Sequence, residues 1–235
     1  MYEILRERCG LRQDVKVLEV GPGTGKATRR LLDLGAEPLV GIEPDPRLAT
    51  FLRESLGGRV ELRETALEDA ELETDFGLAA AAASFHWVDE DIGLAKLHAA
   101  LQPGAWVALW WTSFGDETRP DPFMQAVDPL FENVPHSPSG PSAGRPSYVR
   151  DAELRLAALA RADFVERHHD EMRWTNEWDA EGIRGLYATF SPINSLEADR
   201  RRDLLDAVER IAEVEFDGCV EKRLITSLYT ARRLA

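Results

Sequence analysis

Residues 15–28 read Val15-Lys16-Val17-Leu18-Glu19-Val20-Gly21-Pro22-Gly23-Thr24-Gly25-Lys26-Ala27-Thr28. A short apolar run with β-branched residues leads into a glycine-rich turn, and a helical pattern follows through Leu31, Leu32 and Leu34. Strand, glycine turn and helix in this order open a nucleotide-binding βαβ unit. Glycines allow positive φ and a close approach of the backbone to a ligand, and the N–H groups of the following helix face that ligand.

The spacing of the glycines distinguishes between the nucleotide ligands that such a turn could bind. A dinucleotide fingerprint needs G-x-G-x-x-G, whereas this turn reads G-x-G-x-G with Lys26 in the place of the last glycine. Glu19 lies two residues ahead of the first glycine, where a carboxylate would repel a pyrophosphate but suits a ligand with an ammonium group. The phosphate-binding pattern G-x-x-x-x-G-K-[ST] cannot be drawn through these residues either.

The segment Glu19–Gly25 resembles the first motif of the class I S-adenosylmethionine (SAM)-dependent methyltransferases. The resemblance implies an α/β fold, a Rossmann-like seven-stranded and mostly parallel sheet with helices on both faces. It also implies SAM as cofactor and S-adenosylhomocysteine as product. The resemblance covers residues 15–111 well and residues 226–233 loosely. Ser84-Phe85-His86-Trp87-Val88-Asp89 is most similar to the small-molecule branch that includes trans-aconitate methyltransferase.

A second acidic residue follows the strand predicted at residues 38–43. Glu43 stands 18 residues beyond Gly25, and an acid about 20 residues past the turn accepts both ribose hydroxyls. The alternative is that Glu43 caps the next helix together with Pro44 and Asp45. With the resemblance, the predicted cofactor-binding residues are Glu19, Gly21, Pro22, Gly23, Thr24, Gly25, Glu43, Pro44, Ala66, Leu67, Ala83 and Ser84.

The adenine contact departs from the family pattern. The strand predicted at residues 59–63 leads into Thr65-Ala66-Leu67-Glu68-Asp69. In the family this turn usually offers an Asp to the adenine amino group, followed by an apolar residue against the ring. Here Ala66 takes the place of the acid and Leu67 is the apolar residue. Either backbone groups bind adenine, or Glu68 or Asp69 substitutes for the missing acid.

We assign the alanine run at residues 76–83 to a strand of the sheet in spite of its helix propensity. The binding site for the methyl acceptor is predicted just beyond this strand. His86 lies where the methyl group faces the acceptor in family members, and its ordinary pKa is near neutrality. It is either a general base or, with Trp87, a wall of the pocket. Methyl transfer itself requires alignment of the acceptor, and a base only for acceptors of high pKa. The predicted substrate-binding residues are His86, Trp87, Trp111 and Tyr187.

The rest of the chain predicts one methyltransferase domain over residues 1–235 with a helical cap insertion. A proline-rich stretch at residues 112–148 is expected to be a long loop with one helix near 124–131, forming part of a substrate lid. Because the chain begins almost at its first helix, Tyr2 and this loop are expected to cover the cofactor, unless the start is truncated. The predicted core is 1–111, 151–173 and 218–235, with cap or lid segments at about 112–150 and 174–217.

The composition of the chain limits the classes of molecule that it is expected to bind. The chain is 44% hydrophobic and 30% charged, with a net charge of −14, which disfavours nucleic acid and anionic membranes. No apolar run approaches the ~20 residues of a membrane span, and we expect a cytoplasmic protein, monomer or homodimer, acting on a small-molecule acceptor.

The motif [DN]-P-P-[YFW] of methyltransferases that act on nucleobases is absent. Cys9 and Cys219 form no zinc pattern, so no metal is predicted. Arg145, Arg150, Arg155 and Arg161 could line a basic pocket, but a solvated helix face is the favoured interpretation.

Two classes of function remain open. The first is a SAM-dependent methyltransferase acting on a small organic acceptor, which Glu19, the glycines and Glu43 favour. The second is a catalytically idle protein of the same fold that binds a ligand or partner, which the lost adenine acid and the short start favour. A dehydrogenase using NAD is disfavoured by Lys26 in the glycine turn.

Overall fold

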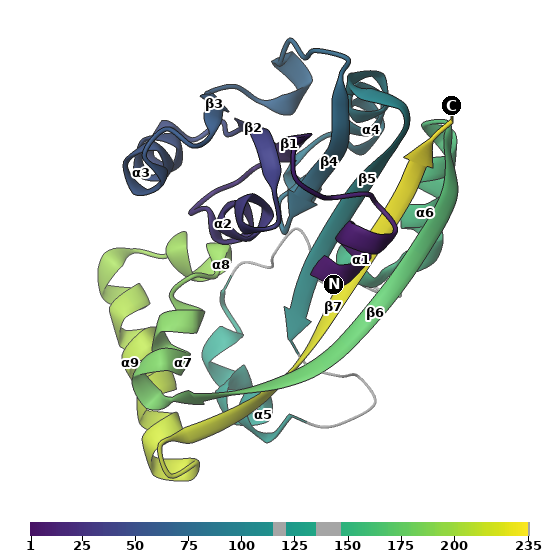
Figure 1. Ribbon diagram of the computed structural model, residues 1–235. Coiled ribbons are helices and arrows are strands. Elements are labelled where there is room, and N and C mark those ends of the chain that lie inside the picture. The colour runs from purple at the N-terminus through teal and green to yellow at the C-terminus, as the bar shows by residue number, and fades with distance from the viewer. Residues whose placement is uncertain (115–120, 135–146, 235) are drawn as a thin grey trace. The chain divides into compact units, whose positions relative to one another are not determined.

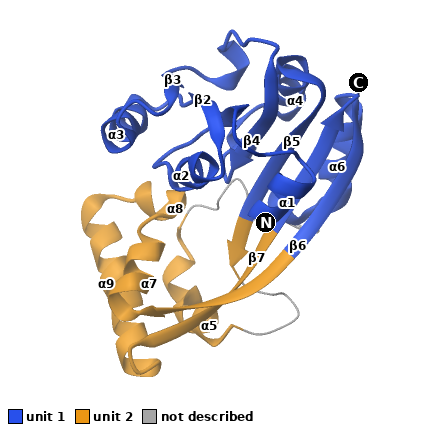
Figure 2. Cartoon of the chain, in the orientation of Figure 1, with its two compact units in different colours: residues 1–111, 148–171, 227–235 blue, residues 112–147, 172–226 orange. Residues whose placement is uncertain are grey.

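A computed structural model describes residues 1–114, 121–134 and 147–234. The chain divides into two compact units (Figure 2). Unit 1 comprises residues 1–111, 148–171 and 227–235, and unit 2 comprises residues 112–147 and 172–226. The predicted lid residues 115–120 and 135–146 lie outside the described part of the chain. The division into one core with cap segments stays a prediction.

Seven strands form one sheet in the order β3-β2-β1-β4-β5-β7-β6. The pairs β1/β2, β1/β4, β2/β3 and β4/β5 are parallel, and β7 runs opposite to β5 and β6 (Figure 1). The predicted Rossmann-like, mostly parallel sheet is therefore confirmed. The strands are β1 (Val15–Val20), β2 (Ala36–Ile42), β3 (Glu61–Arg63), β4 (Phe76–Ala82), β5 (Leu101–Phe114), β6 (Phe164–Asp179) and β7 (Cys219–Arg233).

In unit 1 the helices cover both faces of the sheet, with α1 in front and α6 behind in Figure 1. They are α1 (Tyr2–Glu7), α2 (Lys26–Asp33), α3 (Pro46–Leu56), α4 (Glu90–Ala100) and α6 (Ala152–Arg161). Strand β4 runs through the centre of the core, where Leu78, Ala79, Ala80 and Ala81 are all fully buried. Central parallel strands are covered on both faces, so small apolar residues need not alternate with polar ones.

Strands β5 and β6 extend furthest beyond their predicted bounds. Strand β5 was expected from Trp106, after a turn at residues 102–105. Leu101 already pairs with Phe76, and the register shifts before Trp106 pairs with Leu78, so the proline–glycine segment forms an irregularity inside the strand. Strand β6 is predicted to end at Met172 but continues to Asp179. The added residues are mostly polar and do not alternate between apolar and polar as a half-buried strand does.

Unit 2 has its own apolar core. Between β6 and β7 the chain forms α7 (Ala180–Tyr187), α8 (Ser191–Asn194) and α9 (Ala198–Glu215), and α5 (Pro122–Val127) precedes them. The predicted helices near residues 124–131 and between strands six and seven are thus present. The buried residues of this core are Phe123, Val127, Val134, Ile183, Tyr187, Ile193, Leu204, Leu205, Val208, Ala212 and Val220. Lys222 is buried as well and pairs with Asp121, Nζ to Oδ2, at 2.7 Å.

None of the described helices is both long and apolar enough to cross a bilayer. In the described ranges we also find no group of three or more His, Cys, Asp or Glu side chains placed to hold a metal ion.

Candidate functional site

The glycine turn follows β1 directly and has a left-handed backbone at Gly21, Gly23 and Gly25, with φ between 57° and 76°. A Cβ at Gly21 would lie 2.5 Å from the Cβ of Ser84, so this glycine allows the turn to pack against the end of β4. A Cβ at Gly23 would meet only a carbonyl oxygen at 4.0 Å. Pro22 and Gly25 are buried in the turn, whereas Thr24 is exposed. The turn is therefore closed toward β4 at Gly21 and open at Gly23.

Glu19 lies on β1, fully buried just ahead of this turn. Within the described chain neither carboxylate oxygen has a hydrogen-bond partner, and neither has the hydroxyl of neighbouring Thr28. Burial raises the pKa of Glu19 to about 7, the Thr28 hydroxyl opposes this rise, and the Glu43 carboxylate adds to it. Burial and the Glu19 charge likewise raise the pKa of Tyr2. A buried carboxylate without donors is suited to a cationic ligand group.

Glu43 lies at the tip of the neighbouring strand and is 4% exposed. Its Oε2 accepts the Gly23 N–H at 3.0 Å, and its Oε1 accepts the Asp45 N–H at 3.0 Å. The side chain of Asp45, rather than Glu43, caps α3, and Pro44 is exposed beside it. Each Glu43 oxygen retains a second lone pair. The carboxylate is therefore held in place by backbone donors and can still accept hydroxyl groups.

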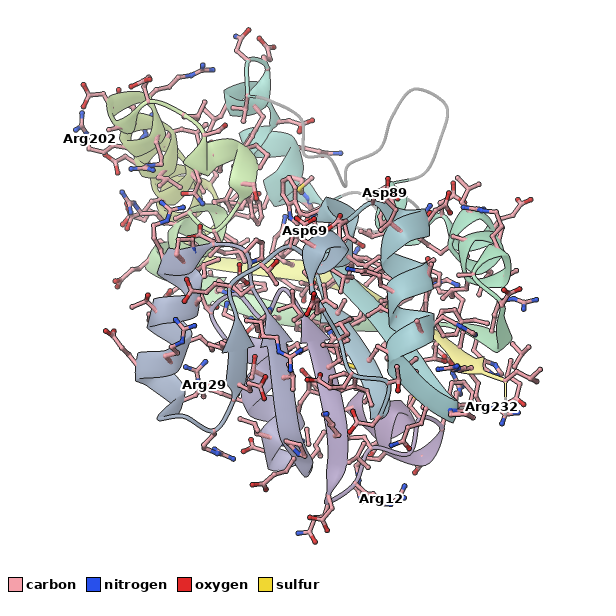
Figure 3. All side chains as sticks on the ribbon, turned by 90° about the horizontal axis from the view of Figure 1, so that it is seen from above. Arg12, Arg29, Asp69, Asp89, Arg202 and Arg232 are labelled. Atoms are coloured by element: carbon pink, nitrogen blue, oxygen red, sulfur yellow. The ribbon has the colours of Figure 1, made fainter. Side chains whose placement is uncertain are left out.

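The turn after β3 places Ala66 ahead of a short 3₁₀ helix at Leu67–Asp69, with Leu67 buried and Asp69 exposed. Oε1 of Glu68 accepts the Asp89 N–H at 2.8 Å; Asp69 and Asp89 are labelled in Figure 3. One of the two acids that could replace the missing adenine ligand thus already bonds to the chain through one oxygen.

The end of β4 is bonded to both neighbouring strands. Ala83 has a φ of 53° and donates its N–H to the Trp110 carbonyl at 2.8 Å. The Ser84 hydroxyl donates to the Val20 carbonyl at the end of β1. Non-glycine residues with positive φ cluster at functional sites. These two contacts fix the backbone that carries His86 and Trp87.

His86 follows in a second short 3₁₀ helix, Phe85–Trp87. Its Nδ1 accepts a hydrogen bond from Nε1 of Trp111 at 3.1 Å, and burial lowers its pKa. The Trp87 ring is 5.0 Å from the His86 ring and 60% exposed, whereas Trp111 is only 2% exposed. Trp87 is thus accessible from solvent, whereas Trp111 is buried and bonded to His86.

Sequence reasoning missed Tyr148, whose ring lies 6.4 Å from that of His86 and 5.7 Å from that of Trp111. Its hydroxyl donates to Oε1 of Glu90 at 2.9 Å. Arg155 stacks on the Tyr148 ring at 3.6 Å and pairs with the same Glu90 oxygen at 2.8 Å. Arg155 is 7% exposed, so its interpretation as part of a solvated helix face is wrong. Its position inside an otherwise ordinary helical pattern gave no signal of this burial.

Tyr187, the remaining predicted acceptor residue, belongs to unit 2. It is 3% exposed and packs against Phe123, Phe131 and Phe190. Its role in acceptor binding stays a prediction.

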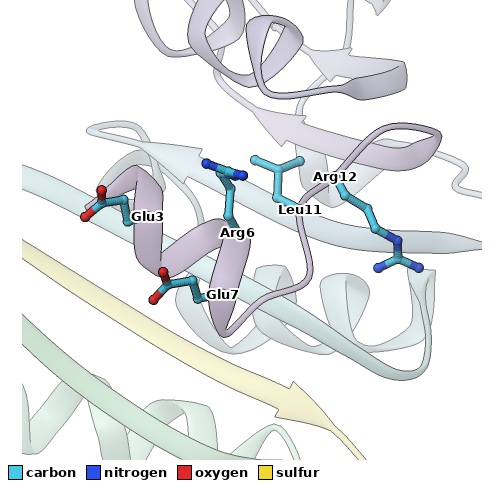
Figure 4. Close-up of a pocket in the computed structure, with 5 residues that line it drawn as sticks. All are labelled: Glu3, Arg6, Glu7, Leu11 and Arg12. Carbon is cyan, nitrogen blue, oxygen red and sulfur yellow. The ribbon is translucent and has the colours of Figure 1, made fainter.

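A hollow beside α1 is lined by Glu3, Arg6, Glu7, Leu11 and Arg12 (Figure 4). It adjoins the chain that enters the amino end of β1, whereas the glycine turn follows the carboxyl end of that strand. Its four charged side chains are exposed and of both signs. We therefore place the functional site at the glycine turn and not in this hollow.

The glycine turn, Glu19 and Glu43 thus lie together at the carboxyl ends of β1 and β2. A family model described as "Methyltransferase domain" matches residues 17–104. Uncharacterized methyltransferase Mb3374 of Mycobacterium bovis is 30% identical over 196 residues, which are 83% of this chain and 72% of that protein. The chain belongs to the class I SAM-dependent methyltransferases, the family whose cofactor is SAM.

Two further comparisons cover a smaller share of the other protein. Ribosomal RNA small subunit methyltransferase A of Rhizobium meliloti is 37% identical over 107 residues, 43% of this chain and 38% of that protein. Phosphoethanolamine N-methyltransferase 2 of Haemonchus contortus, solved in complex with S-adenosyl-L-methionine, has a TM-score of 0.61 at 13% identity. That match covers 100% of this chain and 52% of the Haemonchus protein, so the chain spans about half its length. This likeness shows the fold.

Proposed function

We propose that this methyltransferase transfers the methyl group of SAM to a small organic acceptor and releases S-adenosylhomocysteine. The observation that carries the proposal is the Glu19 carboxylate, which is fully buried and, among the described residues, has no hydrogen-bond partner on either oxygen. A buried carboxylate in this state is unfavourable until a cation reaches it. The ammonium group of SAM is such a cation, so the residues present fit the cofactor.

The geometry of the turn supports the other proposed cofactor contacts. The second lone pairs of the Glu43 oxygens would accept the ribose hydroxyls, and Leu67 and Ala66 would lie beside the adenine. Gly23 leaves room for the ligand, while Gly21 and Ser84 join the end of β4 to β1 and Ala83 joins it to β5. SAM supplies a methyl group that is already activated on a sulfonium centre. The chain's own part is to bind, orient and exclude water.

A small acceptor is supported by the side chains at the end of β4. Trp87 presents a large apolar surface with a polar edge, which suits an organic molecule, and His86 lies beside it. The net charge of −14 is unfavourable for a phosphate backbone. Similarity to the ribosomal RNA enzyme covers only 43% of the chain. We place the reaction in the cytoplasm.

One observation favours a second candidate, a protein that binds SAM without transferring its methyl group. Ala66 stands where the family usually has the adenine acid, and Glu68 is bonded through Oε1 to the Asp89 N–H. Adenine recognition then depends on backbone groups or on Asp69, and a weakly held cofactor can serve as a ligand without turnover.

Release of S-adenosylhomocysteine distinguishes the two candidates. The protein is incubated with SAM and a panel of carboxylic acids, phenols and primary amines, and Glu43→Ala serves as the blank. We expect release above the blank with at least one member of the panel. Calorimetric binding of SAM without release from any member would favour the binding protein and contradict the proposed transfer.

A further inference from the structure

Outside the cofactor site, the contact that constrains the chemistry most is the hydrogen bond between Trp111 and His86. The donor is Nε1 of Trp111, the acceptor is Nδ1 of His86, and the two atoms are 3.1 Å apart. Trp111 lies on β5, and His86 lies in the short 3₁₀ helix that follows the neighbouring strand β4. Among the described residues, Nε2 of His86 makes no hydrogen bond, and it is not one of the buried polar atoms that lack a partner.

An indole nitrogen can only donate, so Nδ1 of His86 must present a lone pair to it. In a neutral imidazole one nitrogen carries the proton and the other accepts, and the bond made by one nitrogen sets the state of the other. The proton therefore resides on Nε2. We propose that Trp111 is a positioning residue that locks His86 as a neutral imidazole, so that Nε2–H donates a hydrogen bond to the acceptor and His86 is not a general base.

The surroundings of Trp111 make this lock rigid. Its ring is 2% exposed and meets Tyr148 and Tyr229 edge to face, with centroids at 5.7 and 6.1 Å. The Tyr229 hydroxyl donates to the Val149 carbonyl at 3.0 Å, and that of Tyr148 is bonded to Glu90. The indole is therefore enclosed by aromatic side chains that are themselves hydrogen-bonded, which restricts its movement away from His86.

This inference rests on the proposed function, because it requires the acceptor to bind beside His86. It also narrows the acceptor class. A histidine that donates through Nε2–H cannot take a proton from the acceptor at that atom. The acceptor therefore reaches the site with a free lone pair at its reacting atom, and it presents an oxygen that accepts the His86 hydrogen bond. A carboxylic acid in its ionised form meets both conditions.

The tautomer can be measured without any acceptor. Two-bond proton–nitrogen correlation spectra of the ¹⁵N-labelled protein at pH 8 report which ring nitrogen of His86 is protonated, with His86→Gln used to assign the signal. We expect a protonated Nε2 and an unprotonated Nδ1, and in Trp111→Phe a mixture of both tautomers. A protonated Nδ1 in the unmodified protein would overturn the inference.

The rate of methyl transfer provides a second test, which does not require the Trp111→Phe variant to fold. Glutamine has an amide N–H near the position of Nε2 but cannot titrate, whereas leucine has no donor. With an acceptor found in the panel, we expect His86→Gln to be about 10-fold faster than His86→Leu, with a pH profile unchanged from the unmodified enzyme. Equal, strongly reduced rates for both variants would indicate a base and refute the donor role.

His168 is exposed on β6 and serves as the matched control. His168→Gln is expected to leave the rate unchanged. If no panel member yields S-adenosylhomocysteine, the proposed function fails, and the spectra still decide whether the Trp111 lock exists.

Discussion

Replacing Glu19 with glutamine is expected to stabilise the cofactor-free protein at pH 8 while weakening its binding of SAM. The pKa of Glu19 is raised from 4.5 to about 7 by its burial. At about 1.4 kcal/mol per pH unit, this rise makes the ionised carboxylate cost roughly 3 kcal/mol of folding free energy. Glutamine keeps the shape of the side chain and removes the charge.

The sign of the pH dependence follows from the direction of the shift. Since the pKa is higher in the folded state, the folded protein binds the proton more tightly than the unfolded chain between pH 4.5 and about 7. The Glu19 contribution to the free energy of unfolding therefore falls as pH rises through this window and is level above it. Glu19→Gln lacks this fall, so its stability relative to the unmodified protein should rise by about 3 kcal/mol from pH 4.5 to pH 8.

Urea unfolding of both proteins at a series of pH values measures this difference. Glu43→Gln is the matched control, because an amide NH₂ there would face the backbone N–H of Gly23 or Asp45, and it should lose about 1–3 kcal/mol at pH 8. A stability difference for Glu19→Gln that stays constant with pH, or falls as pH rises, would refute the reasoning.

Three further outcomes are expected. SAM should bind about tenfold more weakly at pH 6 than at pH 8 by calorimetry, because Glu19, with its pKa of about 7, must lose its proton to pair with the ammonium group; an affinity that is level over this range would argue against that pairing. Gly21→Ala should lower the thermal midpoint strongly, since its Cβ would lie 2.5 Å from that of Ser84. Gly23→Ala meets no close atom and should cost only about 1–2 kcal/mol of left-handed strain, but it should impair SAM binding. Equal thermal midpoints for the two variants would contradict this. Arg155→Met should lower the free energy of unfolding by about 1–3 kcal/mol, because it removes the buried partner of Glu90, which is part-exposed and keeps its bond from Tyr148. Arg161→Met, at an exposed pair, should change it by less than about 1 kcal/mol. Similar losses for the two variants in urea unfolding would contradict this.

The part of the fold that local patterns determine was predictable from the sequence. The run from Val15 to Thr28 gave strand, turn and helix, because apolar periodicity and glycine spacing act over a few residues. Val20 pairs with Ile42, so Glu19 and Glu43 come to neighbouring strand tips as the βαβ interpretation predicted. The alanine run of β4 was assigned to a strand, against its helix propensity, because it ends in Ser84–Asp89, where the family that the sequence resembles has its fourth strand.

Other features depend on contacts between distant segments. No local pattern distinguishes Arg155, which is buried by Glu90 and Tyr148, from the exposed Arg161 on the same helix. The bond from Trp111 to His86 spans 25 residues of sequence and depends on the register of β4 against β5. The polar continuation of β6 to Asp179 is set by pairing in the sheet, since its own residues bury little surface.

The central claim is that Glu19 and Glu43 hold the two ends of SAM across the glycine turn. Isothermal titration of SAM at pH 8 into the unmodified protein, Glu19→Ala, Glu43→Ala and the control Asp75→Asn, at the amino end of β4, tests it most directly. We predict that each glutamate variant weakens the affinity at least tenfold, about 1.4 kcal/mol, and that the control leaves it unchanged. Unchanged affinity in both glutamate variants would contradict the account.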